Sequence, residues 1–164
     1  MNPRSIQRIV MATDFSDASA EALETAVGFA RDCGASLDLV HVATEVAYPV
    51  PPPVDLLRMP IDLPSVVAEA SSRLQLEEVR VRALGVACES NVLVGRAPAE
   101  IVDHAEKAGA DLIILGTHGR SGLGHALLGS VAEKVVQHAR CPVLTVPQRR
   151  PALDSERAAT SPSH

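Results

Sequence analysis

The sequence predicts an α/β fold in which a parallel sheet is covered by helices on both faces. Short apolar runs alternate with segments of helical periodicity five times along the chain. The first three of these segments form a strand–helix–strand unit, which is the right-handed crossover of a parallel sheet. A glycine-rich loop follows the fourth apolar run, and in such sheets ligands bind at the carboxyl ends of the strands.

The strands are predicted from the apolar runs. They are expected at Arg8–Ala12, Ala35–Val42, Glu89–Gly95, Asp111–Leu115 and Cys141–Pro147. Pro142 and Pro147 bracket the last run, and because proline donates no ladder hydrogen bond, this strand is predicted at the edge of the sheet.

The helices are predicted from apolar residues that recur with helical spacing. They are expected from Ser16 or Asp17 to Cys33, from Ser65 to about Ala83, from Pro98 to Ala108 and from Val131 to Ala139. Their inward faces are expected to be Leu23, Ala26, Val27 and Ala30, then Val66, Val67, Ala70 and Leu74, then Ile101, Val102, Ala105 and Ala108. Gly34 and Gly109 are placed to end the first and third helices in the left-handed conformation.

The domain is predicted to span residues 5–147. The proline-rich segment Tyr48–Pro64 predicts a long irregular loop, either a flap over the binding site or a plain surface connection. The tail from Gln148 to His164 has no periodic apolar face and is predicted to be disordered.

Composition excludes several classes of function. A formal net charge of −5 and 2% aromatic residues argue against a nucleic-acid-binding surface and against an anionic membrane surface. No apolar segment is long enough to span a membrane, and no signal peptide is recognisable, so a cytoplasmic protein is predicted. Cys33, Cys88 and Cys141 are odd in number and far apart, so we expect buried apolar thiols and neither disulfides nor a metal site.

The glycine-rich loop carries the functional signal. Gly116, Gly119, Gly129 and Ser130 give the spacing Gly-x2-Gly-x9-Gly-Ser, between an apolar strand and the first turn of a helix. A helix N-terminus offers unpaired N–H groups and partial positive charge to an anion, and glycine lets the backbone approach it closely. The loop lacks the lysine of a P-loop, and no glycine fingerprint follows the first strand. The pattern therefore predicts a phosphate-binding loop of another kind.

These residues resemble the universal stress protein family, in its ATP-binding subgroup. The resemblance covers residues 5–147 and is carried by Met-Ala-Thr-Asp-Phe-Ser, Leu-Asp-Leu-Val-His-Val, Ala-Asp-Leu-Ile-Ile-Leu-Gly-Thr-His-Gly-Arg-Ser-Gly-Leu, Leu-Leu-Gly-Ser-Val-Ala-Glu-Lys-Val and Cys-Pro-Val-Leu-Thr-Val. It implies a Rossmann-like five-stranded parallel sheet in the order 3-2-1-4-5, and a homodimer formed through the fifth strand, Pro142–Val146.

The resemblance also assigns roles to residues. Asp14 and the backbone near Val42 would receive adenine, while Ala12, Thr13 and Gly116 would line the sugar and the first phosphate. Gly119, Gly129, Ser130 and the Val131 N–H would hold the polyphosphate of ATP, with Mg²⁺ as an optional companion.

Plainer roles stay open for several of these residues. Asp14 and Ser130 could simply cap helices, Arg120 could pair with a phosphate or be an exposed loop residue, and His118 has no carboxylate placed by sequence to orient it as a base. His118 and His125 lack the spacing of metal ligands, so no protein metal site is predicted.

The function predicted from the sequence is a nucleotide-dependent stress-response sensor or regulator that binds ATP and acts on an unknown protein partner. Hydrolysis is expected to be slow or absent, because no P-loop lysine and no obvious base are present. The alternatives are a slow ATPase or phosphotransferase that uses Ser130 or His118, and a dimeric adaptor that works without nucleotide.

Overall fold

The computed structural model describes residues 5–44, 62–117 and 128–148. Its elements follow one another as β1 (Arg8–Ala12), α1 (Asp17–Cys33), β2 (Ser36–Ala43), α2 (Leu63–Ala83), β3 (Cys88–Val94), α3 (Ala97–Ala108), β4 (Leu112–Gly116), α4 (Ser130–His138) and β5 (Val143–Val146). The predicted alternation of strands and helices is confirmed, and every boundary lies within two or three residues of its expected place.

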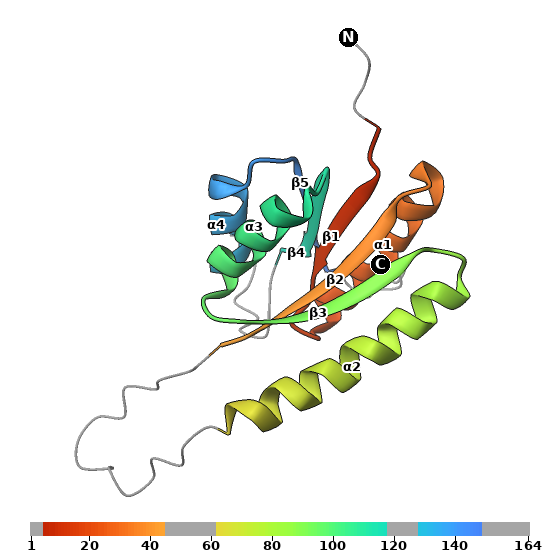
Figure 1. Ribbon diagram of the computed structural model, residues 1–164. Coiled ribbons are helices and arrows are strands. Elements are labelled where there is room, and N and C mark those ends of the chain that lie inside the picture. The colour runs from red at the N-terminus through yellow and green to blue at the C-terminus, as the bar shows by residue number, and fades with distance from the viewer. Residues whose placement is uncertain (1–4, 45–61, 118–127, 149–164) are drawn as a thin grey trace, which may run out of the picture.

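The five strands form one parallel sheet in the order β3-β2-β1-β4-β5 (Figure 1). This order and the parallel pairing confirm the predicted fold class. β1 lies in the middle, with Ile9 opposite Leu37 of β2 on one side and Leu112 of β4 on the other. β5 is an edge strand, as its flanking prolines predicted.

The helices cover both faces of the sheet. α1 and α2 pack on the face that carries Ile9, Met11 and Leu39, and α3 and α4 pack on the face that carries Val10 and Val40. Side chains alternate along a strand, so neighbouring residues enter opposite cores. Both faces of the central strands are therefore buried, which explains their almost continuous apolar sequence.

The helix termini follow local sequence signals. Ser16 caps α1 by accepting a hydrogen bond from the Ser19 N–H, and Gly34 ends the helix at a φ of 66°. Gly109 ends α3 in the same left-handed conformation, at a φ of 65°. Positive φ is strained for side chains other than glycine, which is why glycine stands at both positions.

Two expectations about burial are wrong. All three thiols were expected to be buried, but only Cys88 is. Cys33 is exposed at the end of α1, and Cys141 is partly buried. Burial raises the pKa of the Cys88 thiol to about 12. On α2, Ala70, Leu74 and Val81 are the buried residues, whereas Val66 is 38% exposed, because the start of this long helix extends past the sheet that would cover it (Figure 1).

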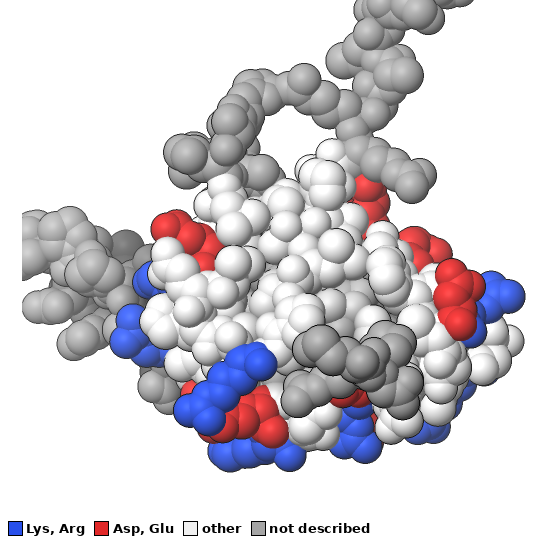
Figure 2. Space-filling view, turned by 90° about the horizontal axis from the view of Figure 1, so that it is seen from above, with Lys and Arg blue, Asp and Glu red and all other residues white. Residues whose placement is uncertain are grey.

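The surface carries charges of both signs. Figure 2 shows lysine and arginine beside aspartate and glutamate around the rim of one face, with uncharged residues in the middle. Among the described residues, no helix is long and apolar enough to cross a membrane. Apart from Gln148, the predicted tail lies outside the described residues, as does most of the proline-rich segment.

Candidate functional site at the carboxyl edge of the sheet

A cavity of about 340 Å³ opens where β1, β2 and β4 end. Three helices begin around it: α1 contributes Ser19, α3 contributes Ala97 and Ile101, and α4 contributes its first turn. We call it the carboxyl-edge cavity. Ligand sites of small molecules usually have volumes of a few hundred Å³ and lie at this edge of α/β sheets.

The carboxyl-edge cavity collects the residues singled out in the sequence. Eight of them line it: Ala12, Thr13, Asp14, Val42, Gly116, Gly129, Ser130 and Val131. Gly119 and Arg120, together with His118 and His125, lie outside the described residues. The described residues that directly follow β1 and β4 thus line one crevice, as their places at adjacent strand ends predicted. The roles of these residues toward a ligand remain predictions.

Seven further residues of the described part of the chain line the cavity. They are Ser19, His41, Ala97, Ile101, Leu115, Thr117 and Ala132. Most are apolar core residues or lie one turn inside a helix, and their periodic spacing indicates only packing. His41 and Thr117 had a usable signal, because each stands beside a predicted site residue at the end of a strand.

The turn between β1 and α1 is held by its own polar side chains. Asp14 Oδ1 accepts hydrogen bonds from the Ser16 N–H at 3.1 Å and from the Ser16 hydroxyl at 2.5 Å. Ser16 in turn caps α1, so Asp14 supports the cap without being the cap itself. The carboxylate is therefore fixed at the wall of the carboxyl-edge cavity by a turn with its own structural role.

Thr13 is anchored by two consecutive residues of the neighbouring strand, β2. Its N–H donates to the Val40 carbonyl at 2.9 Å, and its own carbonyl lies 2.8 Å from His41 Nδ1. A carbonyl oxygen can only accept, so His41 Nδ1 carries the proton in this contact. The end of β2 thus fixes the loop that leaves β1, which the sequence resemblance assigns to adenine and sugar contacts.

Gly116 brings β4 against α1. A Cβ built at Gly116 would lie 3.1 Å from the backbone carbon and oxygen of Ala18. That distance is tighter than ordinary packing, so a side chain here would push the strand end away from the first turn of α1. Gly116 is therefore required for the width of the crevice, whether or not its own backbone meets a ligand.

The N-terminus of α4 is the feature of the cavity best suited to an anion. Gly129 is the N-cap and has no side chain, so it offers no side-chain cap to the amides of the first turn. Its own N–H donates to the Thr117 carbonyl at 2.7 Å, which fixes the start of the helix beside the end of β4. Ser130, Val131 and Ala132 line the cavity with the amides that have no partner within a helix.

The donor set fits a nucleotide better than it fits a metal ion. Backbone amides and the Ser130 hydroxyl suit phosphate oxygens, and the apolar wall of Val42, Ile101 and Leu115 suits a base or sugar. Within the described residues, no group of three His, Cys, Asp or Glu side chains could hold a metal. Mg²⁺, if it enters with ATP, would be held mainly by the phosphates, since Asp14 is the one carboxylate in the described lining.

Comparisons with known proteins point to one family. Residues 5–147 match the model of the universal stress protein family. Universal stress protein MJ0531 of Methanocaldococcus jannaschii is 38% identical over 145 residues, which cover 85% of this chain and 81% of that protein. Universal stress protein YxiE of Bacillus subtilis is 35% identical over 144 residues, which cover 85% of this chain and 97% of the relative.

Solved structures give the same relationship. A universal stress protein in complex with cAMP has a TM-score of 0.66 at 25% identity, over 88% of this chain and 99% of the other. The universal stress protein from Archaeoglobus fulgidus in complex with dAMP has a TM-score of 0.60 at 26% identity, over 86% of this chain and 97% of the other. The sequence, the strand order and these matches lead to one conclusion: the chain belongs to the universal stress protein family.

Proposed function

We propose that this protein binds ATP in the carboxyl-edge cavity and acts as a nucleotide-dependent regulator in a stress response. The observation that carries the proposal is that the α4 N-terminus, whose N-cap Gly129 has no side chain, lines one crevice with Asp14 and Val42. Two relatives of similar fold were solved with adenine nucleotides, cAMP and dAMP, which supports an adenine nucleotide as the ligand. The spacing Gly-x2-Gly-x9-Gly-Ser resembles that of the ATP-binding subgroup of the family, which implies ATP as the nucleotide.

The proposed role is ligand binding with slow or no hydrolysis. Rapid phosphoryl transfer needs a positioned nucleophile and strong compensation of the charge that develops on the phosphates. The described lining contains no lysine and no arginine, and its imidazole, His41, is hydrogen-bonded to Thr13. ATP would then shift the population of a conformation or of an assembly, to the extent that it binds one state more tightly.

ATP titration with a matched pair of variants tests the binding. We expect wild-type protein to bind ATP with 1:1 stoichiometry per chain, and Asp14→Ala to lose at least about tenfold in affinity, as expected for a hydrogen bond to a charged group. Asp17→Ala removes the same charge from an exposed position in the first turn of α1, outside the cavity, and should bind as wild type. Calorimetry or fluorescence with nucleotide-free protein measures both.

Phosphate release measured in parallel separates the regulator from the enzyme. Turnover well above the rate of the protein-free control, abolished by His118→Ala or Ser130→Ala, would establish the ATPase or phosphotransferase instead. Lack of ATP binding at millimolar concentration, with partner capture that does not depend on nucleotide, would favour the dimeric adaptor.

We further propose that the protein forms a homodimer through β5. The hydrogen bonds from Ile113 N to Pro142 O and from Thr117 N to Val146 O mark the side of β5 that faces β4. Since backbone groups alternate along a parallel strand, the N–H and C=O of Val143 and Thr145 point to the open edge. An exposed row of such groups is a template for pairing with a second copy of the strand.

Thr145→Pro is expected to convert the dimer into a monomer. Proline removes a donor from the open edge and leaves the row that bonds β4 in place, and edge strands tolerate it. Thr145→Val keeps the N–H and serves as the control. Sedimentation velocity reads the mass of each variant, and a Thr145→Pro protein that remains dimeric would place the interface elsewhere.

A further inference from the structure

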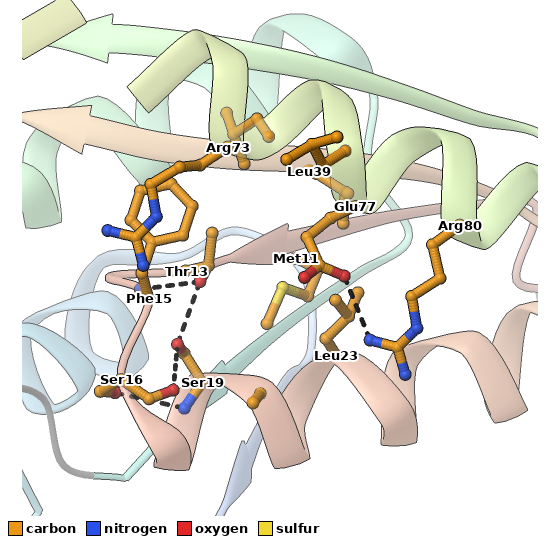
Figure 3. Close-up of a pocket in the computed structure, with 13 residues that line it drawn as sticks. Met11, Thr13, Phe15, Ser16, Ser19, Leu23, Leu39, Arg73, Glu77 and Arg80 are labelled. Atoms are coloured by element: carbon orange, nitrogen blue, oxygen red, sulfur yellow. Dashed lines mark hydrogen bonds and ion pairs between the residues drawn. The ribbon is translucent and has the colours of Figure 1, made fainter. Parts of the chain in front are cut away.

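A second cavity lies between α1 and α2, on the opposite face of the sheet from α3 and α4. It measures about 210 Å³, and we call it the interhelix cavity (Figure 3). Its floor is apolar and buried, formed by Met11, Leu23, Leu39 and Leu74. Of the described residues that the sequence singled out for ATP binding, Thr13 alone lines it.

Two arginines with different partners lie at the mouth of the interhelix cavity. Arg80 is paired with Glu24 of α1 and with Glu77 of its own helix. These carboxylates raise the pKa of the Arg80 guanidinium, so the group stays charged and paired with them. Arg73 instead lies over the ring of Phe15, 4.0 Å from its centroid, and within the described part of the chain it has no carboxylate in salt-bridge range.

The stacking of Arg73 leaves it able to bind an anion. A guanidinium that places its face on an aromatic ring still presents its N–H donors at the edge of the plane, where a carboxylate can meet them. Figure 3 shows the Arg73 guanidinium beside Phe15 and Thr13, while Glu77 points toward Arg80 at the other end. The cavity thus combines an apolar floor with one available cation at its mouth.

Phe15 holds a costly backbone conformation at this place. Its φ is 62°, in the left-handed region that a bulky side chain rarely adopts. The Phe15 N–H donates to Thr13 Oγ1 at 3.0 Å, and its ring contacts the His41 ring at a centroid distance of 4.5 Å. Strained residues of this kind persist where surrounding contacts fix them, and they gather at ligand sites.

The two cavities share a wall. Thr13 and Ser19 line both of them, and Thr13 Oγ1 donates to Ser19 Oγ at 3.0 Å. The Ser19 hydroxyl in turn donates a hydrogen bond to the Ser16 carbonyl at 2.8 Å. A molecule in the interhelix cavity would therefore contact the same turn that positions Thr13 and Asp14 for the carboxyl-edge cavity.

From these observations we propose that the interhelix cavity is a second binding site, which takes a small carboxylate with an apolar body. The apolar body fills the space above Met11, Leu23 and Leu74, and the carboxylate meets Arg73. The volume suits a molecule of the size of hexanoate and is too small for a nucleotide. By restraining Phe15 and Thr13, this ligand strengthens nucleotide binding, a step that rests on the function proposed above.

Titration of the nucleotide-free full chain with sodium hexanoate tests the site directly, with amide chemical shifts as the readout. We expect saturable shifts at Thr13, Phe15, Ser19 and Arg73 with a dissociation constant of about 1 mM or below. The neutral analogue 1-hexanol should bind about tenfold more weakly. No saturable shift at these residues up to 20 mM hexanoate would overturn the proposal.

Two variants and a control test separately the charge of Arg73 and the volume of the interhelix cavity. Arg73→Gln should remove the preference for hexanoate over hexanol, whereas Arg31→Gln, an equal change of charge on the exposed last turn of α1, should keep it. Ala20→Phe places a large side chain at an exposed position of α1 that lines the mouth of the interhelix cavity. It should abolish the chemical-shift changes caused by hexanoate and by hexanol without unfolding α1. Unchanged hexanoate affinity in Arg73→Gln or in Ala20→Phe would contradict the assignment.

The coupling is tested separately with ATP. Saturating hexanoate should tighten ATP binding about three- to tenfold, and ATP should tighten hexanoate binding by the same factor, because linkage is reciprocal. Equal ATP affinity with and without hexanoate would refute the coupling. A protein that binds hexanoate but no ATP would refute the proposed function and leave the second site established.

Discussion

Replacing Ser130 by proline is expected to weaken ATP binding roughly 10- to 100-fold, the range that corresponds to one hydrogen bond to a charged group. Ser130 is the first residue of α4, so its N–H is not used within the helix. Proline removes this N–H together with the hydroxyl. The preceding Gly129 already has φ −60° and ψ 150°, the conformation that a residue before proline prefers, so the helix should form unchanged.

Ser130→Ala is the matched control. It removes the hydroxyl and keeps the N–H, so the difference in ATP affinity between the alanine and proline variants isolates the backbone donor. Calorimetric titration gives both affinities, and thermal unfolding should give similar midpoints for the two variants. If Ser130→Pro bound ATP as well as Ser130→Ala, the backbone N–H of residue 130 would have no part in holding the phosphates.

Removing His104 is expected to cost about 3 kcal/mol of folding free energy, the upper end of the range for leaving a buried hydrogen-bonding group without one of its partners. Asp38 on β2 is 2% exposed, and its carboxylate accepts hydrogen bonds from His104 Nε2 at 2.6 Å and from Asn91 Nδ2 at 3.0 Å. His104→Ala leaves the carboxylate in the core with Asn91 alone. Burial without sufficient partners is costly for a charged group, and denaturant unfolding measures the loss.

Lys107→Ala on the same helix provides the comparison. Lys107 pairs with Asp103 at 2.6 Å, but both side chains are largely exposed, at 75% and 56%. Such exposed pairs contribute little to stability, so this variant should unfold close to wild type. Adding Asp38→Asn to His104→Ala should recover part of the stability, because the buried group is then neutral. Equal losses in the two single variants would mean that the Asp38 carboxylate does not depend on His104.

Much of this fold is predictable from the sequence because it is governed by local rules. Periodicity gives α1 its face of Leu23, Ala26 and Ala30, and all three are buried. The prolines that flank β5 identify an edge strand, and glycine ends two helices. Parallel strands bring the loops that follow them to one side of the sheet, so the fold class predicts the location of the site. Asp14 and Ser130 follow this rule, and both line the carboxyl-edge cavity.

The remaining features depend on contacts between distant parts of the chain. Asp38 looks out of place in an apolar strand until His104, 66 residues away, is brought to it by the packing of α3. The exposure of Val66 depends on how far α2 extends beyond the sheet, which periodicity does not report. The interhelix cavity likewise depends on the spacing of α1 from α2 and on the unusual φ of Phe15. No local pattern encodes any of these quantities.

Thr117 links the proposed dimer strand, β5, to the proposed phosphate site at the N-terminus of α4. Its N–H bonds to Val146 at the rim of β5, and its carbonyl receives the N–H of Gly129 at the head of α4. Thr117 is thus hydrogen-bonded both to β5, through which two copies would pair, and to the start of α4, which would bind a phosphate. These two hydrogen bonds connect the edge strand directly to the N-terminus of α4. If two copies join at β5 as proposed, Thr117 would lie between the dimer interface and the proposed phosphate site of each subunit.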